Sequence, residues 1–248
     1  MSDIQVLKRD GTKEQLNLDK VHKMVEFACE GLAGVSASQV EIQSGLQFCD
    51  GITSNDIQEI LIRSASDLIT EENPNYQYVA ARLLLFGLRK AVHGHPEILP
   101  PLLKHVKGCI DKGVYDSAIV NRYSEEEWDR INSFVDHERD YLFTYAGLRQ
   151  VVDKYLVQDR STGKHYESPQ QMYIMIAATL FANYPTETRL DYVRRYYNAI
   201  STHKINIPTP IMGGVRTPIR QFASCVLVDI DDTLDSIFSS DMAIGKYV

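Results

Sequence analysis

Basic side chains gather around a short turn near the N-terminus. Lys8 and Arg9 precede the pair Asp10-Gly11, and Lys13 follows it. Lys20 lies in the first turn of the helix expected next. The free N–H groups of a helix N-terminus, together with lysines, can hold phosphate groups. The alternative is a solvated hairpin with ordinary surface lysines, and the spacing alone leaves both interpretations open.

Cys225 is the second candidate for chemistry. It follows a stretch rich in glycine and proline and begins the apolar run CVLVDI. A cysteine in a strand is usually a small buried hydrophobe. A strand end beside such a loop, however, is where α/β barrels place their chemistry. A redox cysteine also needs a second thiol within ~7 Å between Cα atoms, and the sequence identifies none of Cys29, Cys49 and Cys109 as that partner.

Several other classes of site are not indicated. The sequence contains no G-x-x-x-x-G-K-[ST], G-x-G-x-x-G or G-x-S-x-G motif. No two of the four cysteines form a CxxC pair, so neither a metal site nor a disulfide framework is expected. The net charge of −7 disfavours direct nucleic-acid binding. No apolar run approaches the ~18 residues of a membrane span, and a reduced, cytoplasmic protein is expected.

The elements that must position these residues are mostly helical. With 44% hydrophobic and 24% charged residues, the composition is that of an ordinary globular protein. The opening segment predicts a β-hairpin around Asp10-Gly11, followed by four helices up to about residue 93. Asn17 and Ser54 are expected to cap two of these helices. The segment 93–101, with one glycine and three prolines, predicts a hinge.

Helices are also expected beyond the hinge. They are interrupted by a second hairpin around Ser161-Thr162-Gly163, and the apolar stretch 170–181 predicts a buried helix. The stretch 205–221 contains three prolines and two adjacent glycines, so no regular helix is expected there. The run CVLVDI predicts a strand. One of the aspartates at 229, 231 and 232 is expected to cap a helix that begins near Thr233.

Long phrases of the sequence resemble one enzyme family. The phrase PTPIMGGVRTPIRQFASCVL resembles the entry to the catalytic barrel of class I ribonucleotide reductase large (alpha) subunits, and VLKRDGTKEQLNLDK resembles their ATP-cone domain. NPNYQYVAARLLLF, HERDYLFTYAG, KYLVQDRSTGKHYESPQ and TETRLDYVRRYYNAISTHKI are similar to the same family. The resemblance implies an ATP-cone over residues 1–93, a helical domain over 94–220, and the first strand and helix of an incomplete ten-stranded α/β barrel over 221–248.

The resemblance also implies an activity and partners. The family reduces ribonucleoside diphosphates to deoxyribonucleoside diphosphates for DNA synthesis, by radical and dithiol chemistry. A metal-radical cofactor is expected in a small beta subunit, thioredoxin or glutaredoxin is expected as reductant, and an alpha-subunit dimer is expected. ATP, dATP and other deoxynucleoside triphosphates are the expected allosteric effectors. The expected location is the cytoplasm, or the host cytosol if the chain is phage-encoded.

The resemblance assigns roles to individual residues. Cys225 matches a cysteine that reduces the substrate and becomes disulfide-bonded, and Thr209 and Ser224 match substrate contacts. The start of the specificity-effector site is matched by Asp232, Thr233 and Leu234. The ATP/dATP activity site is matched by Lys8, Arg9, Glu14, Asn17, Lys20, Ser54 and Lys90.

Two features depart from the family pattern. Gln58 and Gly87 stand where enterobacterial relatives carry histidines beside the effector nucleotide. The chain is also much shorter than family members, so the rest of the barrel is expected from a separate chain, or this chain is a truncation. The alternative function is a non-catalytic nucleotide-sensing module that keeps the cone, although Cys225 has no use in such a sensor.

Overall fold

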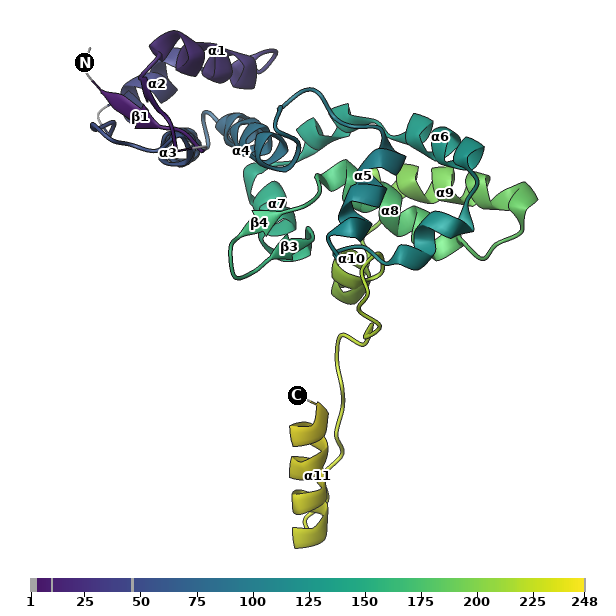
Figure 1. Ribbon diagram of the computed structural model, residues 1–248. Coiled ribbons are helices and arrows are strands. Elements are labelled where there is room, and N and C mark those ends of the chain that lie inside the picture. Colours follow the sequence, from purple (N-terminus) through teal and green to yellow (C-terminus); the bar gives the residue numbers. More distant parts are fainter. Residues whose placement is uncertain (1–3, 10, 46, 248) are drawn as a thin grey trace.

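The computed structural model describes residues 4–9, 11–45 and 47–247. The N-terminal part consists of a two-stranded hairpin followed by four α-helices (Figure 1). The bounds are β1 Gln5–Leu7, β2 Lys13–Gln15, α1 Leu18–Cys29, α2 Ala37–Gly45, α3 Ser54–Asp67 and α4 Tyr76–His93. The predicted hairpin with its four helices is therefore confirmed. Asp10 of the predicted turn lies outside the described residues.

The chain after α4 is again mostly helical. The α-helices are α5 Leu102–Asp111, α6 Glu125–Phe134, α7 Tyr145–Gln150, α8 Pro169–Phe181, α9 Thr186–Ser201, α10 Thr209–Gly214 and α11 Leu234–Tyr247. Between them lie the 3₁₀ helices η1 Ser117–Arg122 and η2 His137–Leu142, the π-helix η3 Val151–Tyr155, and a second hairpin of β3 Gln158–Asp159 and β4 Lys164–His165. The predicted mainly α fold is confirmed. Within the described ranges, no helix combines the length and the apolar character needed to cross a membrane.

The first hairpin is joined to the start of α3. Val6 lies opposite Glu14 in the antiparallel pair, and the Leu7 N–H donates to the Ile52 carbonyl at 2.9 Å. Val6 is buried in the common hydrophobic core, so one face of the hairpin packs inward. As predicted, Asn17 caps α1, because its Oδ1 accepts a hydrogen bond from the Lys20 N–H at 3.0 Å.

Two other helix starts correct the sequence prediction. Thr53, not Ser54, caps α3, because its hydroxyl accepts from the Asp56 N–H at 3.0 Å. The Asp56 carboxylate accepts from the Thr53 N–H in return, which completes a capping box. Thr233 caps α11 through the Ser236 N–H at 3.2 Å, in place of the expected aspartate. In both cases a threonine hydroxyl occupies the position that satisfies the first free N–H groups.

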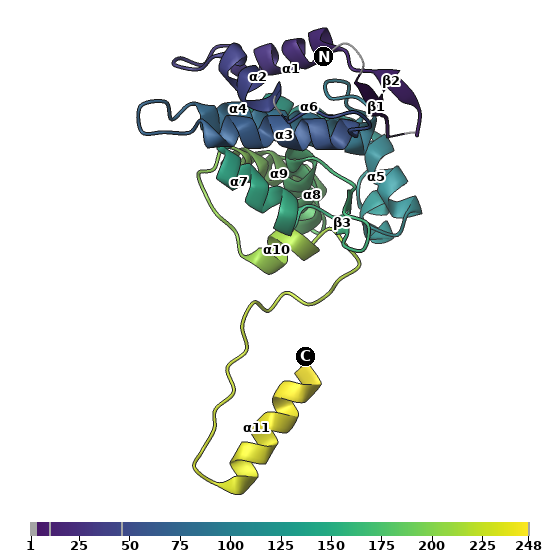
Figure 2. The same ribbon diagram turned by 90° about the vertical axis from the view of Figure 1, so that its left-hand side faces the viewer.

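α4 connects the N-terminal part to the helices that follow. Figure 2 shows α1 and α2 on one side of α3 and α4, and α7, α8 and α9 on the other side. Arg89 near the end of α4 donates to the Asp140 carboxylate at 2.8 Å and to the His137 carbonyl at 2.6 Å, both in η2. α8 is buried from Pro169 to Ala178, as its apolar sequence predicts. The cone and helical parts therefore share one continuous interior.

The C-terminal region differs from the prediction in two ways. α10 is a short helix inside the stretch where no regular helix was expected. Pro210 is tolerated because it lies in the first turn, where its missing N–H removes no intrahelical bond. The strand expected for CVLVDI is not formed, because these residues have no strand beside them in the described structure. This segment and α11 extend away from the helical body in both views (Figures 1 and 2).

Candidate functional site

One cavity collects most of the side chains that the sequence assigned to an effector site. It has a volume of about 580 Å³ and lies among the hairpin, α1, α3 and α4. Its lining includes six of the seven predicted residues: Lys8, Glu14, Asn17, Lys20, Ser54 and Lys90. The size is within the range of small-ligand pockets. Residues that are far apart in the sequence therefore share one space.

Each polar group is placed by a defined local feature. Lys8 lies just beyond β1 and Glu14 lies in β2, so the hairpin brings both to the same end. Asn17 is the N-cap of α1 and Lys20 lies in the first turn of this helix, where the helix dipole favours an anion. Lys90 comes from the last turn of α4. Ser54 is the first residue of α3, so the cavity is formed by one hairpin end and three helix ends.

Positive charge exceeds negative charge in this cavity. Lys8, Lys20, Lys23 and Lys90 line it, against Glu14 and Glu97. Glu14 lies 2.8 Å from the Lys20 ammonium and 2.9 Å from that of Lys8. These hydrogen bonds and charges lower the pKa of Glu14 to about 2. Glu14 therefore stays ionised and neutralises part of the cluster in the absence of a ligand.

Lys90 has no such carboxylate in hydrogen-bond contact within the described structure. Burial lowers the pKa of its ammonium, and repulsion from Arg9, Lys8 and Lys20 lowers it further. A cation held against other cations is stabilised by a bound anion. A polyanionic group such as a triphosphate fits this excess of positive charge.

Arg9, the seventh predicted residue, lies elsewhere. Its Nε donates to Asn55 at 2.8 Å, and it lines a neighbouring cavity of about 350 Å³. Burial lowers the pKa of its guanidinium. The structure therefore does not place Arg9 in the lining of the effector cavity, although its charge acts on Lys90.

The sequence analysis missed the apolar walls of the cavity. Phe27 and Phe86 contribute aromatic surface, and both occupy ordinary helical positions that no motif distinguishes. Gln58 forms a wall shared by this cavity and the one beside Arg9. Its Nε2 donates to the Leu83 carbonyl at 2.7 Å. A Cβ atom on Gly87 would lie 3.0 Å from the Gln58 Cγ, so these two departures from the family pattern are in direct contact.

The Cys225 segment has a different character. Cys225 and Ser224 are exposed, which excludes the buried-core interpretation of this cysteine for the structure as described. All four cysteines are free, and burial raises the pKa of the Cys109 thiol to about 12. Cys109 is therefore unreactive, and no partner thiol for Cys225 is found within the described residues. Thr233 serves as the α11 cap beside Asp232 and Leu234.

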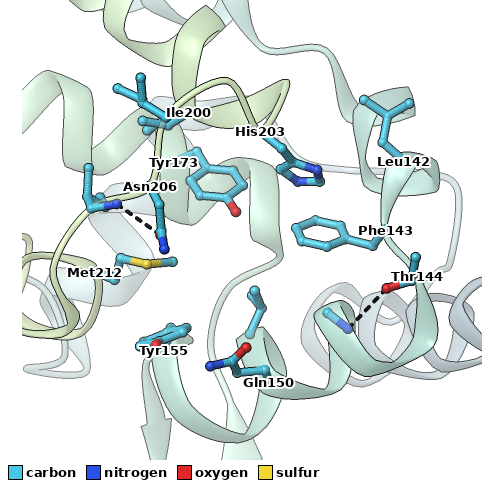
Figure 3. A pocket seen from close by; sticks show the side chains of 14 residues that line it. Leu142, Phe143, Thr144, Gln150, Tyr155, Tyr173, Ile200, His203, Asn206 and Met212 are labelled. Atoms are coloured by element: carbon cyan, nitrogen blue, oxygen red, sulfur yellow. Dashed lines mark hydrogen bonds between the residues drawn. The ribbon is translucent and has the colours of Figure 1, made fainter.

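Thr209, the predicted substrate contact, is the first residue of α10. The Tyr155 hydroxyl lies 3.4 Å from its Oγ1. A third cavity, of about 320 Å³, lies beside α10 and is lined by Tyr155, Tyr173, Ile207 and Met212, among others (Figure 3). The structure does not bring Thr209 into hydrogen-bond contact with Ser224 or Cys225 within the described ranges.

Comparisons with known proteins identify two domains. A profile for the ATP cone domain matches residues 4–91, and one for the ribonucleotide reductase all-alpha domain matches residues 141–220. The chain is 54% identical over 245 residues to the ribonucleoside-diphosphate reductase subunit alpha of Haemophilus influenzae. It is 53% identical over 246 residues to the ribonucleoside-diphosphate reductase 1 subunit alpha of Escherichia coli. Each match covers 99% of this chain and 32% of the relative.

A phage protein shows the same relationship. The ribonucleoside-diphosphate reductase subunit alpha of Enterobacteria phage T4 is 41% identical over 250 residues, covering 100% of this chain and 32% of the relative. The chain thus spans about one third of the length of the curated relatives that it matches. These matches confirm the resemblance found in the sequence. The chain belongs to the ribonucleoside-diphosphate reductase alpha-subunit family and corresponds to the N-terminal third of its members.

Proposed function

We propose that this chain supplies the N-terminal, nucleotide-sensing third of an alpha subunit that reduces ribonucleoside diphosphates to deoxyribonucleoside diphosphates. The observation that carries the regulatory part is the cavity of about 580 Å³ in which four lysines meet two glutamates. The matched ATP cone domain supports ATP and dATP as its ligands. In this proposal Lys8, Lys20 and Lys90 bind phosphate oxygens, and Glu14 gives up its two lysines to the nucleotide.

In this proposal other side chains of the cavity recognise the nucleoside part of the ligand. Asn17 and Ser54 present an amide and a hydroxyl that can hydrogen-bond the ribose or the adenine. Phe27 and Phe86 offer apolar contact to the base. Arg9 is proposed to act at a distance through its charge, because its hydrogen bond goes to Asn55.

Cys225 is proposed as one thiol of the reducing pair. Two thiols lose two electrons and two protons as they become a disulfide, and the substrate gains two electrons as its 2′-hydroxyl leaves as water. An external dithiol, thioredoxin or glutaredoxin, then resets the pair by exchange. Thr209 and Ser224 are proposed substrate contacts, and Asp232, Thr233 and Leu234 are proposed parts of the specificity-effector site. The second thiol belongs to the remainder of the alpha subunit in this proposal.

The proposed partners follow from this division of roles. The remainder of the alpha subunit completes the barrel around Cys225, and a small beta subunit carries the metal-radical cofactor. A second alpha subunit is the proposed dimer partner. The exposed apolar side chains of residues 219–247, such as Leu227 at 97% exposure, support a contact with further protein.

Reconstitution tests the proposal directly. This chain is combined with the remainder of an alpha subunit and with a small subunit, and diphosphate reduction is measured with thioredoxin. Activity is expected for the wild-type chain, and Cys225→Ser should abolish multiple turnovers. Cys49→Ser, at another exposed cysteine, is the matched control and should remain active. An active assembly in which Cys225→Ser still turns over many times would refute the role of Cys225. No reduction by any such assembly, with ATP still bound, would instead favour the non-catalytic sensing module.

A further inference from the structure

A fully buried ion pair lies at the end of α10. Both side chains of Arg216 and Glu167 are 0% exposed. The Arg216 Nε donates to the two Glu167 carboxylate oxygens at 3.1 and 2.8 Å, and its Nη2 also donates to Glu167. Glu167 further accepts hydrogen bonds from the Tyr115 hydroxyl and from the Val157 N–H at 2.7 Å. The charges therefore satisfy each other in the interior.

The same arginine links α10 to several other elements. Its Nη1 donates to the Met212 carbonyl of α10, and its Nη2 donates to the Tyr155 carbonyl of η3 at 3.0 Å. Its own carbonyl accepts from the Asp116 N–H at 3.0 Å. The C-terminal end of α10 is thus fixed to η3 and to the segment before η1. π-helices such as η3 are frequent at functional sites.

The opposite end of α10 is held much less firmly. Thr209 is exposed, and its side chain contacts the Tyr155 hydroxyl at 3.4 Å. The cavity of about 320 Å³ lies beside this end, and Figure 3 shows Tyr155 and Met212 at its wall. Packing therefore leaves space next to α10. Arg216 just after α10 and Tyr155 beside its first residue thus make polar contacts near the two ends of this helix.

We propose that Glu167, Arg216 and Tyr155 are positioning residues that set the orientation of α10 and hold Thr209 where the substrate binds. This inference rests on the proposed function, in which Thr209 contacts the substrate. Glu167 fixes the Arg216 guanidinium, Arg216 fixes the Tyr155 and Met212 carbonyls, and Tyr155 reaches Thr209. A buried ion pair adds little net stability compared with apolar packing, so its contribution is to select one arrangement.

A second buried ion pair provides the matched control. Arg89 and Asp140 have side chains that are 4% and 0% exposed, and the Arg89 Nη2 lies 2.8 Å from the Asp140 carboxylate. This pair joins α4 to η2, and among the described residues it makes no hydrogen bond to α10. Glu167→Gln and Asp140→Asn each remove the negative charge from a buried arginine–carboxylate pair. Both variants are expected to lower the unfolding midpoint.

The experiment compares steady-state reduction of CDP by reconstituted assemblies that carry wild-type chain, Glu167→Gln, Asp140→Asn or Tyr155→Phe. Glu167→Gln is expected to raise KM for CDP by about tenfold with a smaller change in kcat, because a misoriented Thr209 weakens binding. Tyr155→Phe keeps the ring and removes only the hydroxyl, so KM should rise about threefold with an unchanged unfolding midpoint. Asp140→Asn should leave KM unchanged.

Hydrogen exchange in the isolated wild-type and variant chains supplies a readout that does not need activity. The amides of Ile211, Met212, Val215 and Thr217, which donate backbone hydrogen bonds within and just after α10, should exchange faster in Glu167→Gln than in Asp140→Asn. Equal exchange in the two variants overturns the inference, even if no assembly is active. With an active wild-type assembly, an unchanged KM in both Glu167→Gln and Tyr155→Phe also overturns it. An inactive wild-type assembly together with selective loosening of α10 contradicts the proposed function, and it supports only the part of the inference in which Glu167 and Arg216 orient α10.

Discussion

In the effector cavity, four lysines share two glutamates and stay in contact with water, whereas Arg216 and Glu167 are buried and pair one to one. Both regions are rich in charge, yet among the described residues only the cavity has more cations than carboxylates. Lys90 is repelled by Arg9, Lys8 and Lys20, while Arg216 has acceptors for Nε and both Nη groups. An unbalanced, accessible cluster is suited to an incoming anion. A balanced, inaccessible pair holds parts of the chain in place.

Partly or fully buried histidines extend this comparison, because their charge is excluded from the interior. They give the largest expected effect, a dependence of the unfolding free energy on pH. Burial lowers the pKa of His93, His105 and His137 to about 4 in each case. The unfolded chain binds protons on these groups near pH ~6.5. Their contribution to stability is therefore fully present above pH ~6.5 and is lost as the pH falls towards about 4. The unfolding free energy should decrease steeply when the pH falls from 6 to 5.

His105→Gln tests this prediction. Urea unfolding followed at several pH values gives the slope of the unfolding free energy against pH. In His105→Gln this slope should be smaller than in wild type by about 1.4 kcal/mol per pH unit, because one proton fewer is taken up on unfolding. His22→Gln is the control with the opposite sign. Contact with Glu41 and Glu26 raises the pKa of His22, so its contribution is fully present below pH ~6.5 and is lost as the pH rises. An acid slope that is equal in His105→Gln and wild type would show that His105 does not stay neutral in the folded chain.

The sequence predicted the effector cavity better than it predicted the polar interior. Lys8, Asn17 and Lys20 belong to a local pattern, a hairpin end followed by a capped helix, and local patterns are readable from spacing. Arg216 and Glu167 are 49 residues apart, in two separate phrases of the sequence, and nothing in either phrase indicates that the two side chains pair, so only the folded chain brings them together. The resemblance supplied Lys90 and Ser54, which come from distant helices.

The C-terminal segment shows why the rest could not be predicted. The apolar run CVLVDI has the composition of a strand, but a strand needs a neighbour for its backbone hydrogen bonds. Residues 225–230 have no neighbouring strand in the described structure, so local propensity is not realised. α10 was missed for the opposite reason, because Pro210 in a first turn permits a helix. Local sequence therefore sets preferences, and tertiary contacts decide whether they are expressed.

Lys90→Ala gives the next largest effect and tests the excess of positive charge. ATP binding to the isolated chain, measured by calorimetry, should weaken about tenfold, equivalent to about 1.4 kcal/mol. The unfolding midpoint should not fall, because removal of Lys90 relieves repulsion from Arg9, Lys8 and Lys20. Lys107→Ala, on an exposed position of α5, is the matched control and should bind ATP normally. If Lys90→Ala and Lys107→Ala weaken ATP binding by the same factor, the cause is the general loss of positive charge and not the loss of a contact in this cavity.

Glu14→Gln gives the smallest expected change in affinity. It tests whether the Glu14 carboxylate only competes with phosphate for the lysines or also hydrogen-bonds the nucleoside. Glu14 holds Lys8 and Lys20 in the absence of a ligand, so it competes with phosphate for both lysines. Loss of its charge should raise the affinity for inorganic triphosphate by about threefold at low salt, and the gain should shrink as salt screens the charges. Affinity for ATP should rise by the same factor if Glu14 contacts only the lysines. If Glu14 also bonds the nucleoside, the gain for ATP will be smaller than the gain for inorganic triphosphate. A lower affinity for inorganic triphosphate would contradict the competition, because that probe carries no ribose or base for Glu14 to recognise.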